Sequence, residues 1–492
     1  MRYILPLLLF TLFFACGDTP PPPAMPPLSD LPLVPLPVEI SNSEGYLYVD
    51  PAEVINNEGA DAGAVAYLKS KEVPALPLTT NMDPALRLSD GAYSLQIASE
   101  GVTITAKDQA GLLNGAITLE QVVAFSPDTE RGLFLPAGTI TDQPRYAYRG
   151  YMLDVARTFF GVDTVKQVID RISTYKINHL HLHLSDDQGW RIEIKSWPGL
   201  AQIGGMFEVD GTPGGYYTQE DYKEIVRYAA AQGITIVPEI DMPGHTNAAL
   251  NAYAELNLDG KARDPYFGTK VGFSTLDANK EITYEFIDAV VGEIAAITPG
   301  PYFHIGGDES AVTPHDDYVK LIRRAQEIVI SHGKKSIGWD EVAVAGLDEG
   351  SIAQLWNHSE YALMAKKEGN QVLFSPATRT YLDMQYDSLS RLGLHWAAYI
   401  EVDSAYLWDP KAMVDGITDA DIMGVEAPLW GETIRSIEDI DYLTFPRLLA
   451  LAEVGWTPQP KRNYEDFLRR LRAQQTWLKE KGIGTYDTRV LR

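Results

Sequence analysis

Two adjacent carboxylates, Asp308 and Glu309, follow the short apolar run of residues 303–305 and a pair of glycines. An apolar run of this kind predicts a buried strand, so the two acids are expected at a strand end. Two carboxylates this close repel each other, and at least one should keep its proton to a higher pH than a free carboxyl group. A carboxyl group prepared in this way can act as a general acid, which favours a catalytic site over an ordinary acidic turn.

Polar and aromatic side chains follow most of the other short apolar runs as well. They are Asp154, Arg157, Asp186, Asp187, Glu239, Asp241, His245, Trp339, Asp340, Glu341, Trp356, Trp430 and Glu432. Tryptophan faces stack on the apolar faces of pyranose rings, while carboxylates and arginine form paired hydrogen bonds with sugar hydroxyls. The combination is therefore typical of a sugar-binding site.

The elements that must position these side chains predict a (β/α)8 TIM barrel over residues 145–492. Eight strands are expected, at residues 148–155, 177–184, 234–240, 302–305, 336–339, 352–356, 372–374 and 422–426. Helical patterns fill most of the gaps, at residues 162–175, 218–232, 282–297 and 318–332, and those between the fifth and seventh strands are short. The C-terminal ends of barrel strands meet at one rim, where active sites lie, so the polar side chains should gather there.

Residues 38–144 predict a small α/β domain in front of the barrel, which makes the whole chain α/β in class. Residues 93–98 and 101–106 alternate apolar and polar positions, which indicates a β-hairpin. Asp108 is expected to cap the helix that follows. No catalytic residues stand out in this segment, so we interpret it as structural support.

The N-terminus has the pattern of a processing signal. Arg2 precedes the apolar run of residues 4–14, and Cys16, the only cysteine, follows directly. This arrangement, predicted as a signal peptide over residues 1–16, resembles the lipidation site of a bacterial lipoprotein; ordinary secretion with an incidental cysteine is the alternative. Residues 17–37 are rich in proline and predict an extended spacer. The expected location is the bacterial cell envelope, with a lipid anchor at Cys16 holding the protein to the membrane.

Composition limits the choice of partners. The chain has 492 residues, of which 45% are hydrophobic and 22% charged, so it can bury a large core. Its formal net charge of −26 argues against binding nucleic acid and favours a neutral or cationic substrate. The sequence indicates no particular oligomeric state.

The seventh expected strand bears on the mechanism. Retaining glycosidases usually place a second carboxylate about 5–5.5 Å from the acid as the nucleophile. In many barrel enzymes this carboxylate would follow the seventh strand, but residues 375–378 here are Ser, Pro, Ala and Thr. Since the two clearest acids are adjacent, a nucleophile supplied by the substrate explains the pattern better.

At the level of motifs, the chain resembles the β-N-acetylhexosaminidases of glycoside hydrolase family 20. The matching stretches are LDVARTFF at 153–160, HLHLSDDQGWR at 181–191, PEIDMPGH at 238–245, HIGGDE at 304–309, GWDE at 338–341, QLWN at 354–357, YLD at 381–383 and PLWGE at 428–432. The resemblance implies release of terminal β-linked GlcNAc or GalNAc by substrate-assisted retaining hydrolysis, a known exception to the two-carboxylate mechanism. It implies neither a cofactor nor a metal.

The resemblance also implies a role for each site residue. Glu309 would be the general acid and then the base for water, Asp308 would hold the N–H of the substrate's 2-acetamido group, and Tyr381 would donate to its carbonyl oxygen. The other roles are Trp339, Trp356 and Trp430 as pocket walls with Asp383 beside them, Arg157 and Glu432 as ligands of the sugar hydroxyls, and Asp186 and His245 as supports of the acid pair.

Two alternatives stay open. Histidines alternate at residues 179, 181 and 183, and a His-x-His strand also occurs in metal-dependent barrel hydrolases, although we expect these to be core or rim histidines. A catalytically inactive glycan-binding surface lipoprotein would keep the pocket too. Binding alone, however, would not need the acid pair or Tyr381.

Overall fold

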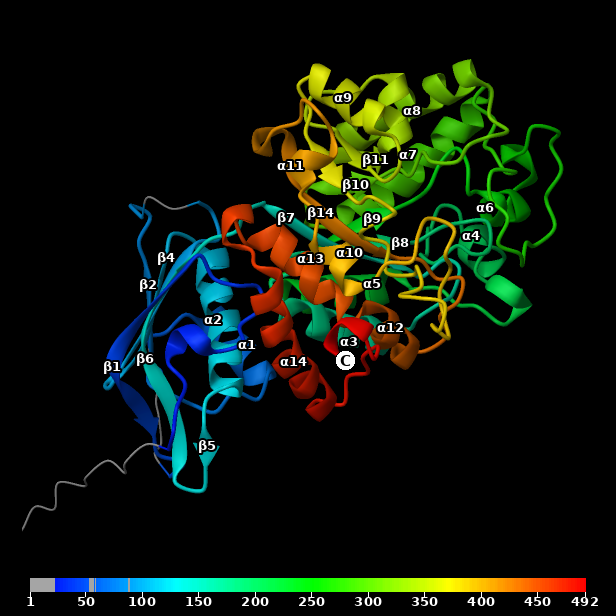
Figure 1. Ribbon diagram of the computed structural model, residues 1–492. Coiled ribbons are helices and arrows are strands. Elements are labelled where there is room, and N and C mark those ends of the chain that lie inside the picture. The colour runs from blue at the N-terminus through cyan, green and yellow to red at the C-terminus, as the bar shows by residue number, and fades with distance from the viewer. Residues whose placement is uncertain (1–22, 53–56, 58, 87–88) are drawn as a thin grey trace, which may run out of the picture.

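The computed structural model describes residues 23–52, 57, 59–86 and 89–492, which form a small α/β domain and a closed barrel (Figure 1). The predicted signal peptide and Cys16 lie outside the described residues. Within the described part of the chain, no helix is long and apolar enough to cross a membrane.

The small domain is a twisted sheet of six strands in the order β1-β6-β3-β4-β2, with β5 paired to β6. Its elements are β1 (Glu39–Val49), α1 (Ala62–Ser70), β2 (Leu78–Met82), β3 (Tyr93–Ala98), β4 (Gly101–Ala106), α2 (Gln109–Ala124), β5 (Asp128–Thr129) and β6 (Gly132–Asp142). The expected hairpin is confirmed as β3 and β4, and the Asp108 carboxylate accepts from the backbone N–H of Gly111 at the start of α2. Both helices lie on the face of the sheet toward the barrel (Figure 1).

The barrel closes through eight parallel strands in chain order, from β7 to β14. They are β7 (Tyr148–Asp154), β8 (His179–His183), β9 (Thr235–Glu239), β10 (Tyr302–His304), β11 (Lys335–Trp339), β12 (Ile352–Leu355), β13 (Val372–Phe374) and β14 (Ile422–Leu429). All eight expected strands are thereby confirmed. They form from continuous apolar runs because strands of a parallel sheet are buried on both faces.

Helices cover the outside of the barrel. The longer ones are α3 (Val162–Ser173), α5 (Gln219–Ala231), α7 (Glu281–Ala296), α8 (His315–Ser331), α9 (Ser359–Lys367), α12 (Ile437–Thr444), α13 (Arg447–Trp456) and α14 (Tyr464–Glu480). Short helices are α4 (Gly199–Gln202), α6 (Asn247–Ala252), α10 (Val402–Tyr406) and α11 (Pro410–Met413). Single 3-10 turns are η1 (Leu28–Asp30), η2 (Val209–Gly211), η3 (Ala254–Leu256), η4 (Asp340–Ala345), η5 (Asp419–Asp421), η6 (Gln459–Lys461) and η7 (Arg489–Leu491).

The prediction of an extended spacer over residues 17–37 is wrong for residues 28–37. These residues form a packed strap between the two domains. Three leucines of the strap are buried in the core of the small domain: Leu28, Leu31 and Leu33. The backbone N–H of Val34 donates to Gln121 of α2 (2.9 Å), and that of Leu36 donates to Glu453 of α13 (3.0 Å). The strap thus contacts both the small domain and the barrel.

The strap should contribute measurably to stability. Leu33→Ala removes a fully buried side chain and is expected to lower the free energy of unfolding by about 2–5 kcal/mol. The matched control is Pro26→Ala, an exposed position just before the strap, which should change it by less than about 0.5 kcal/mol. Chemical denaturation measures the free energy of unfolding of each variant. Equal denaturation curves for Leu33→Ala and Pro26→Ala would show that the strap is not packed in solution.

Candidate active site

A cavity of about 230 Å³ opens at the rim formed by the C-terminal ends of the barrel strands. Eight of the predicted site residues line it: Arg157, Asp308, Glu309, Trp356, Tyr381, Asp383, Trp430 and Glu432. They come from the ends of β7, β10, β12 and β14 and from the loop after β13. The barrel therefore brings together residues that are up to 275 positions apart in the sequence.

The acid pair sits on an unusual turn after β10. Gly306 and Gly307 have φ angles of 67° and 104°, and a Cβ atom on Gly306 would lie 1.7 Å from Oδ1 of Asp241. Only glycine fits this close approach. Glu309 also adopts a left-handed conformation, with φ of 48°, which is costly and occurs mostly where function requires it. The turn directs Asp308, with 10% of its side chain exposed, into the cavity floor and Glu309, with 37% exposed, toward its mouth.

The environment of Asp308 moves its titration to near neutral pH. Burial raises the pKa of Asp308 to about 7; His245 opposes this rise, while Glu341 and Glu309 add to it. The expectation that at least one member of the pair holds its proton to higher pH is confirmed for Asp308. At neutral pH a substantial fraction of Asp308 is therefore ionised, and this form can accept a hydrogen bond from a substrate N–H that carries developing positive charge.

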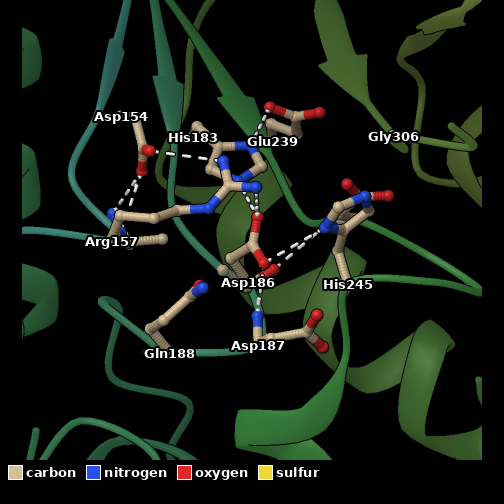
Figure 2. A network of polar contacts seen from close by, with 12 residues as sticks. Asp154, Arg157, His183, Asp186, Asp187, Gln188, Glu239, His245 and Gly306 are labelled. Atoms are coloured by element: carbon tan, nitrogen blue, oxygen red, sulfur yellow. Dashed lines mark hydrogen bonds and ion pairs between the residues drawn. The ribbon is translucent and has the colours of Figure 1, made fainter. Parts of the chain in front are cut away.

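Behind the acid pair, Asp186 is the centre of a buried polar network (Figure 2). Its carboxylate contacts Arg157 Nη2 (2.7 Å), His183 Nε2 (2.9 Å) and His245 Nδ1 (3.1 Å). His245 Nε2 lies 3.6 Å from the Asp308 carboxylate and 3.5 Å from that of Glu309. His245 thus lies next to both acids and Asp186 next to His245, while their role as supports of the acid pair stays a prediction.

The charges in this network follow from its contacts. Although burial opposes it, Arg157 and His245 hold the pKa of Asp186 well below its usual range. Burial likewise opposes protonation of His245, but Asp186 and Asp308 raise its pKa well above the ordinary histidine value. At neutral pH Asp186 is therefore an anion and His245 a cation. The cationic His245 faces the acid pair.

Arg157 is held rigidly at the other side of the cavity. Its guanidinium contacts Asp154 (3.2 Å) and Asp186 (2.7 Å) and lies 4.9 Å from the ring centroid of Trp430. Burial lowers the pKa of Arg157. Asp186, Asp154 and Glu432 outweigh this effect, so the pKa is raised overall. A fixed guanidinium beside a carboxylate is suited to bind two neighbouring hydroxyl groups.

Aromatic rings form the walls of the cavity. The centroids of Tyr381 and Trp430 are 6.0 Å apart, and each lies within contact distance of a further tryptophan. Trp339 differs from the expected wall position: only 1% of it is exposed, it lies behind Trp430 at 5.6 Å, and its indole N–H donates to Glu239 (2.9 Å). Trp339 thus supports the wall from behind.

Comparison with known proteins identifies the family. Residues 146–459 match the family model described as glycosyl hydrolase family 20, catalytic domain, and residues 30–143 match that described as domain 2 of the same family. The chain belongs to glycoside hydrolase family 20. It is a glycoside hydrolase of the β-N-acetylhexosaminidase type.

Relatives of family 20 cover nearly the whole chain. A β-N-acetylhexosaminidase of Cellulomonas fimi is 41% identical over 426 residues, which are 86% of this chain and 83% of the relative. Among solved structures, a mutant Streptomyces plicatus β-hexosaminidase in complex with the product GlcNAc has a TM-score of 0.89 and 43% identity, covering 95% of this chain and 98% of that one. The Streptomyces coelicolor A3(2) β-N-acetylhexosaminidase has a TM-score of 0.88 and 40% identity, covering 95% and 99%.

The family 20 pocket of this chain also contains residues that sequence analysis missed. They are Thr269, Val271, Leu394 and Trp396. Trp396 is 57% exposed, and its ring centroid lies 6.1 Å from those of both Trp356 and Tyr381. These four residues belong to long loops after β9 and β13, whose sequences contain no periodic signal that predicts where they fold.

Free acceptor atoms remain in the pocket for a polar ligand. Both carboxylate oxygens of Asp383 and Oε2 of Glu432 are buried and accept no hydrogen bond from the described residues. Burial and the neighbouring Glu432 raise the pKa of Asp383 well above its usual range. Buried polar groups of this kind need partners, and sugar hydroxyls can supply them.

The alternating histidines of β8 belong to the barrel interior, as expected. His181 lies 2.9 Å from both Glu239 and Glu426, and these two acids raise its pKa to about 9 despite burial. His183 contacts Glu239 as well as Asp186, so it connects this interior network to the active site. His181, Glu239 and His304 are close enough to hold a metal, yet the family 20 relationship does not favour the metal-dependent alternative, nor the inactive lectin.

Proposed function

We propose that the protein is an exo-acting β-N-acetylhexosaminidase that releases terminal, non-reducing β-linked GlcNAc or GalNAc from glycans or chitooligosaccharides. The acetamido oxygen of the substrate acts as the nucleophile, and the anomeric configuration is retained. The observation that carries this proposal is the unequal acid pair, with Asp308 on the cavity floor opposite Tyr381 and Glu309 at its mouth. The residues after β13, from Ser375 to Thr378, provide no carboxylate nucleophile.

The proposed reaction has two steps. In the first, Asp308 accepts a hydrogen bond from the acetamido N–H, and the Tyr381 hydroxyl donates one to the acetamido oxygen. These two hydrogen bonds orient that oxygen to attack C1. The bond from C1 to the leaving oxygen breaks as Glu309 gives its proton to that oxygen, which yields an oxazolinium intermediate. In the second, Glu309 takes a proton from water, whose oxygen forms the new bond to C1 and reopens the ring.

Exo action is supported by the size of the cavity. Its volume of about 230 Å³ is below the range of roughly 300–1,000 Å³ that is usual for drug-sized ligands, which favours a single sugar residue over a longer chain. Arg157, Trp430 and Glu432 line this cavity together with Glu309, and the Arg157 guanidinium lies 4.9 Å from the Trp430 ring centroid. The S. plicatus structure is described as a complex of that relative with the product GlcNAc.

A hydrolysis panel tests the proposal. We expect turnover of aryl β-GlcNAc, aryl β-GalNAc and chitobiose, and only very slow turnover of aryl β-glucoside, which lacks the acetamido nucleophile. Comparable rates on the β-glucoside would disprove substrate assistance. Glycan binding without any turnover would support the lectin alternative instead.

We further propose that the protein is lipid-anchored at Cys16 in the bacterial cell envelope, on the basis of the apolar leader and the only cysteine of the chain. Cys16→Ser is expected to move the protein from the membrane fraction to the soluble fraction, because the variant has no thiol to which the lipid anchor could be attached. Specific activity should not change, since the active site is built from residues 154–432. Fractionation followed by immunoblotting measures the effect, and unchanged membrane association would indicate another mode of attachment.

A further inference from the structure

A second pair of adjacent acids, Asp340 and Glu341, lies beside the pocket without lining it. They follow β11 and begin the 3-10 turn η4. Asp340 is fully buried, and Glu341 is partly buried. Neither residue has a place in the reaction described above, so their contacts call for a separate explanation.

Asp340 fixes the backbone of the loop that carries Trp356. Its Oδ2 atom accepts from three successive backbone N–H groups, those of Trp356 (3.1 Å), Asn357 (3.0 Å) and His358 (2.9 Å). A carboxylate anion accepts hydrogen bonds more strongly than a neutral carboxyl group does, so these three donors favour the ionised form of Asp340. Asp340 therefore holds the start of the loop after β12 against the end of β11.

Glu341 fixes the side chain of the same tryptophan. Its Oε2 atom accepts from the indole N–H of Trp356 at 2.9 Å. A protonated carboxyl group at this position can in addition donate to the adjacent Asp340 carboxylate. The backbone and the ring of Trp356, a wall of the sugar pocket, are thus held by one carboxyl–carboxylate pair.

The surroundings of Glu341 favour the neutral form. Burial raises the pKa of Glu341 to about 8, and the neighbouring Asp340 adds to the rise. The other titratable groups that face it are Asp308 on the loop after β10, Tyr318 on α8, Tyr361 on α9 and Tyr381 on the loop after β13. These are acids and phenols, so no cation among them compensates a negative charge on Glu341.

We propose that Glu341 is a positioning residue: by accepting from its indole N–H it holds the Trp356 ring at the wall of the sugar pocket, while the neighbouring Asp340 fixes the backbone that carries this ring. This inference rests on the proposed function, because it concerns the same pocket. Glu341 itself touches neither the sugar nor the reacting atoms.

The test measures the Kd of N-acetylglucosamine by calorimetry, which does not depend on the general acid. Glu341→Gln keeps the acceptor for the indole and a donor for Asp340, so it should bind within about threefold of the wild type at pH 6. Glu341→Ala leaves the indole N–H unpaired and should weaken binding by about 5- to 100-fold. Glu360→Gln, an exposed acid near the same loop, is the matched control and should have no effect.

The pH dependence separates positioning from simple structural support. Glu341 is neutral below its pKa and charged above it, and the charged form is repelled by the adjacent Asp340. This repulsion should shift the pair of acids and the tryptophan they hold, so the wild-type Kd should rise as the pH passes through about 8. Glutamine does not ionise, and the Glu341→Gln variant should lack this part of the rise. An identical pH profile for the two proteins would overturn the inference.

A double-mutant cycle tests the route through Trp356. Trp356→Phe keeps an aromatic wall but removes the indole N–H, so its effect on Kd should not add to that of Glu341→Ala. Additive effects would show that Glu341 acts elsewhere and would overturn the inference. If the alanine variant does not fold, as thermal unfolding will show, Trp356→Phe is measured across the same pH range: it should lack the part of the rise in Kd that Glu341→Gln lacks, and a rise equal to that of the wild type would overturn the inference.

The result also distinguishes this inference from the proposed function. A wild-type protein that neither binds N-acetylglucosamine nor hydrolyses its aryl glycoside would overturn both. A different result would overturn the positioning role alone: the wild type binds N-acetylglucosamine and hydrolyses its aryl glycoside, but Glu341→Gln and Glu341→Ala lose affinity to the same extent.

Discussion

Asp308→Ala is expected to lower kcat/KM on an aryl N-acetyl-β-glucosaminide by about 100- to 1,000-fold, or about 2.7–4 kcal/mol of transition-state stabilisation. The acetamido N–H loses its acceptor on the cavity floor, so the carbonyl oxygen is no longer aimed at C1. The positive charge that develops on the nitrogen also loses its carboxylate partner. Steady-state kinetics with purified protein measure the loss, and a circular dichroism spectrum confirms that the variant is folded.

The matched control for this variant is Asp316→Ala, an exposed acid at the start of α8, which should leave kcat/KM unchanged. A thiazoline mimic of the cyclised intermediate should inhibit the wild type far more tightly than N-acetylglucosamine does. Trapping of a covalent sugar on any carboxylate with a fluorosugar would contradict the mechanism and restore a two-carboxylate scheme.

Glu309→Gln is expected to lower kcat on substrates with poor leaving groups, such as chitobiose, by about 100- to 10,000-fold. Glutamine keeps the shape of the side chain at the cavity mouth but cannot donate the proton that the leaving oxygen needs. Binding of N-acetylglucosamine should therefore be nearly unchanged. Aryl glycosides whose phenols are acidic leave without a proton, so their first step should suffer much less.

The comparison of these two substrate classes decides the role of Glu309. A loss that grows with the pKa of the leaving group identifies the general acid. An equal loss on both classes would remove Glu309 from that role and would point to a defect in water activation or in pocket structure.

The sequence predicted the barrel well because its strands are buried on both faces and therefore appear as uninterrupted apolar runs. The runs that end at Asp154, Glu239 and His304 are examples. Since the ends of all strands must meet at one rim, the side chains that follow them could be grouped without coordinates. The placement of Asp308, Glu309 and Asp186 followed from this geometric rule.

The remaining features depend on packing that no local pattern records. Leu28 and Leu33 are buried although prolines surround them, because the strap packs these leucines into the core of the small domain while forming only the single 3-10 turn η1. Trp339 ends a strand like any wall residue, but the acceptor Glu239 draws its ring behind Trp430. Trp396 reaches the pocket from a long loop, and its position depends on contacts with Trp356 and Tyr381.

The shared carboxylate of Asp186 has a consequence for how this enzyme can evolve. It binds the arginine beside the sugar hydroxyls with the same group that orients the histidine facing the acid pair. Under the proposed mechanism, a mutation that moves Arg157 also disturbs Asp186, and with it the histidine that faces the acid pair, so hydroxyl preference and acid–base chemistry are expected to change together. Residues at the mouth, such as Thr269 and Trp396, have no contact with Asp186 among the described interactions. New substrate preferences can accumulate there without disturbing the contacts of Asp186.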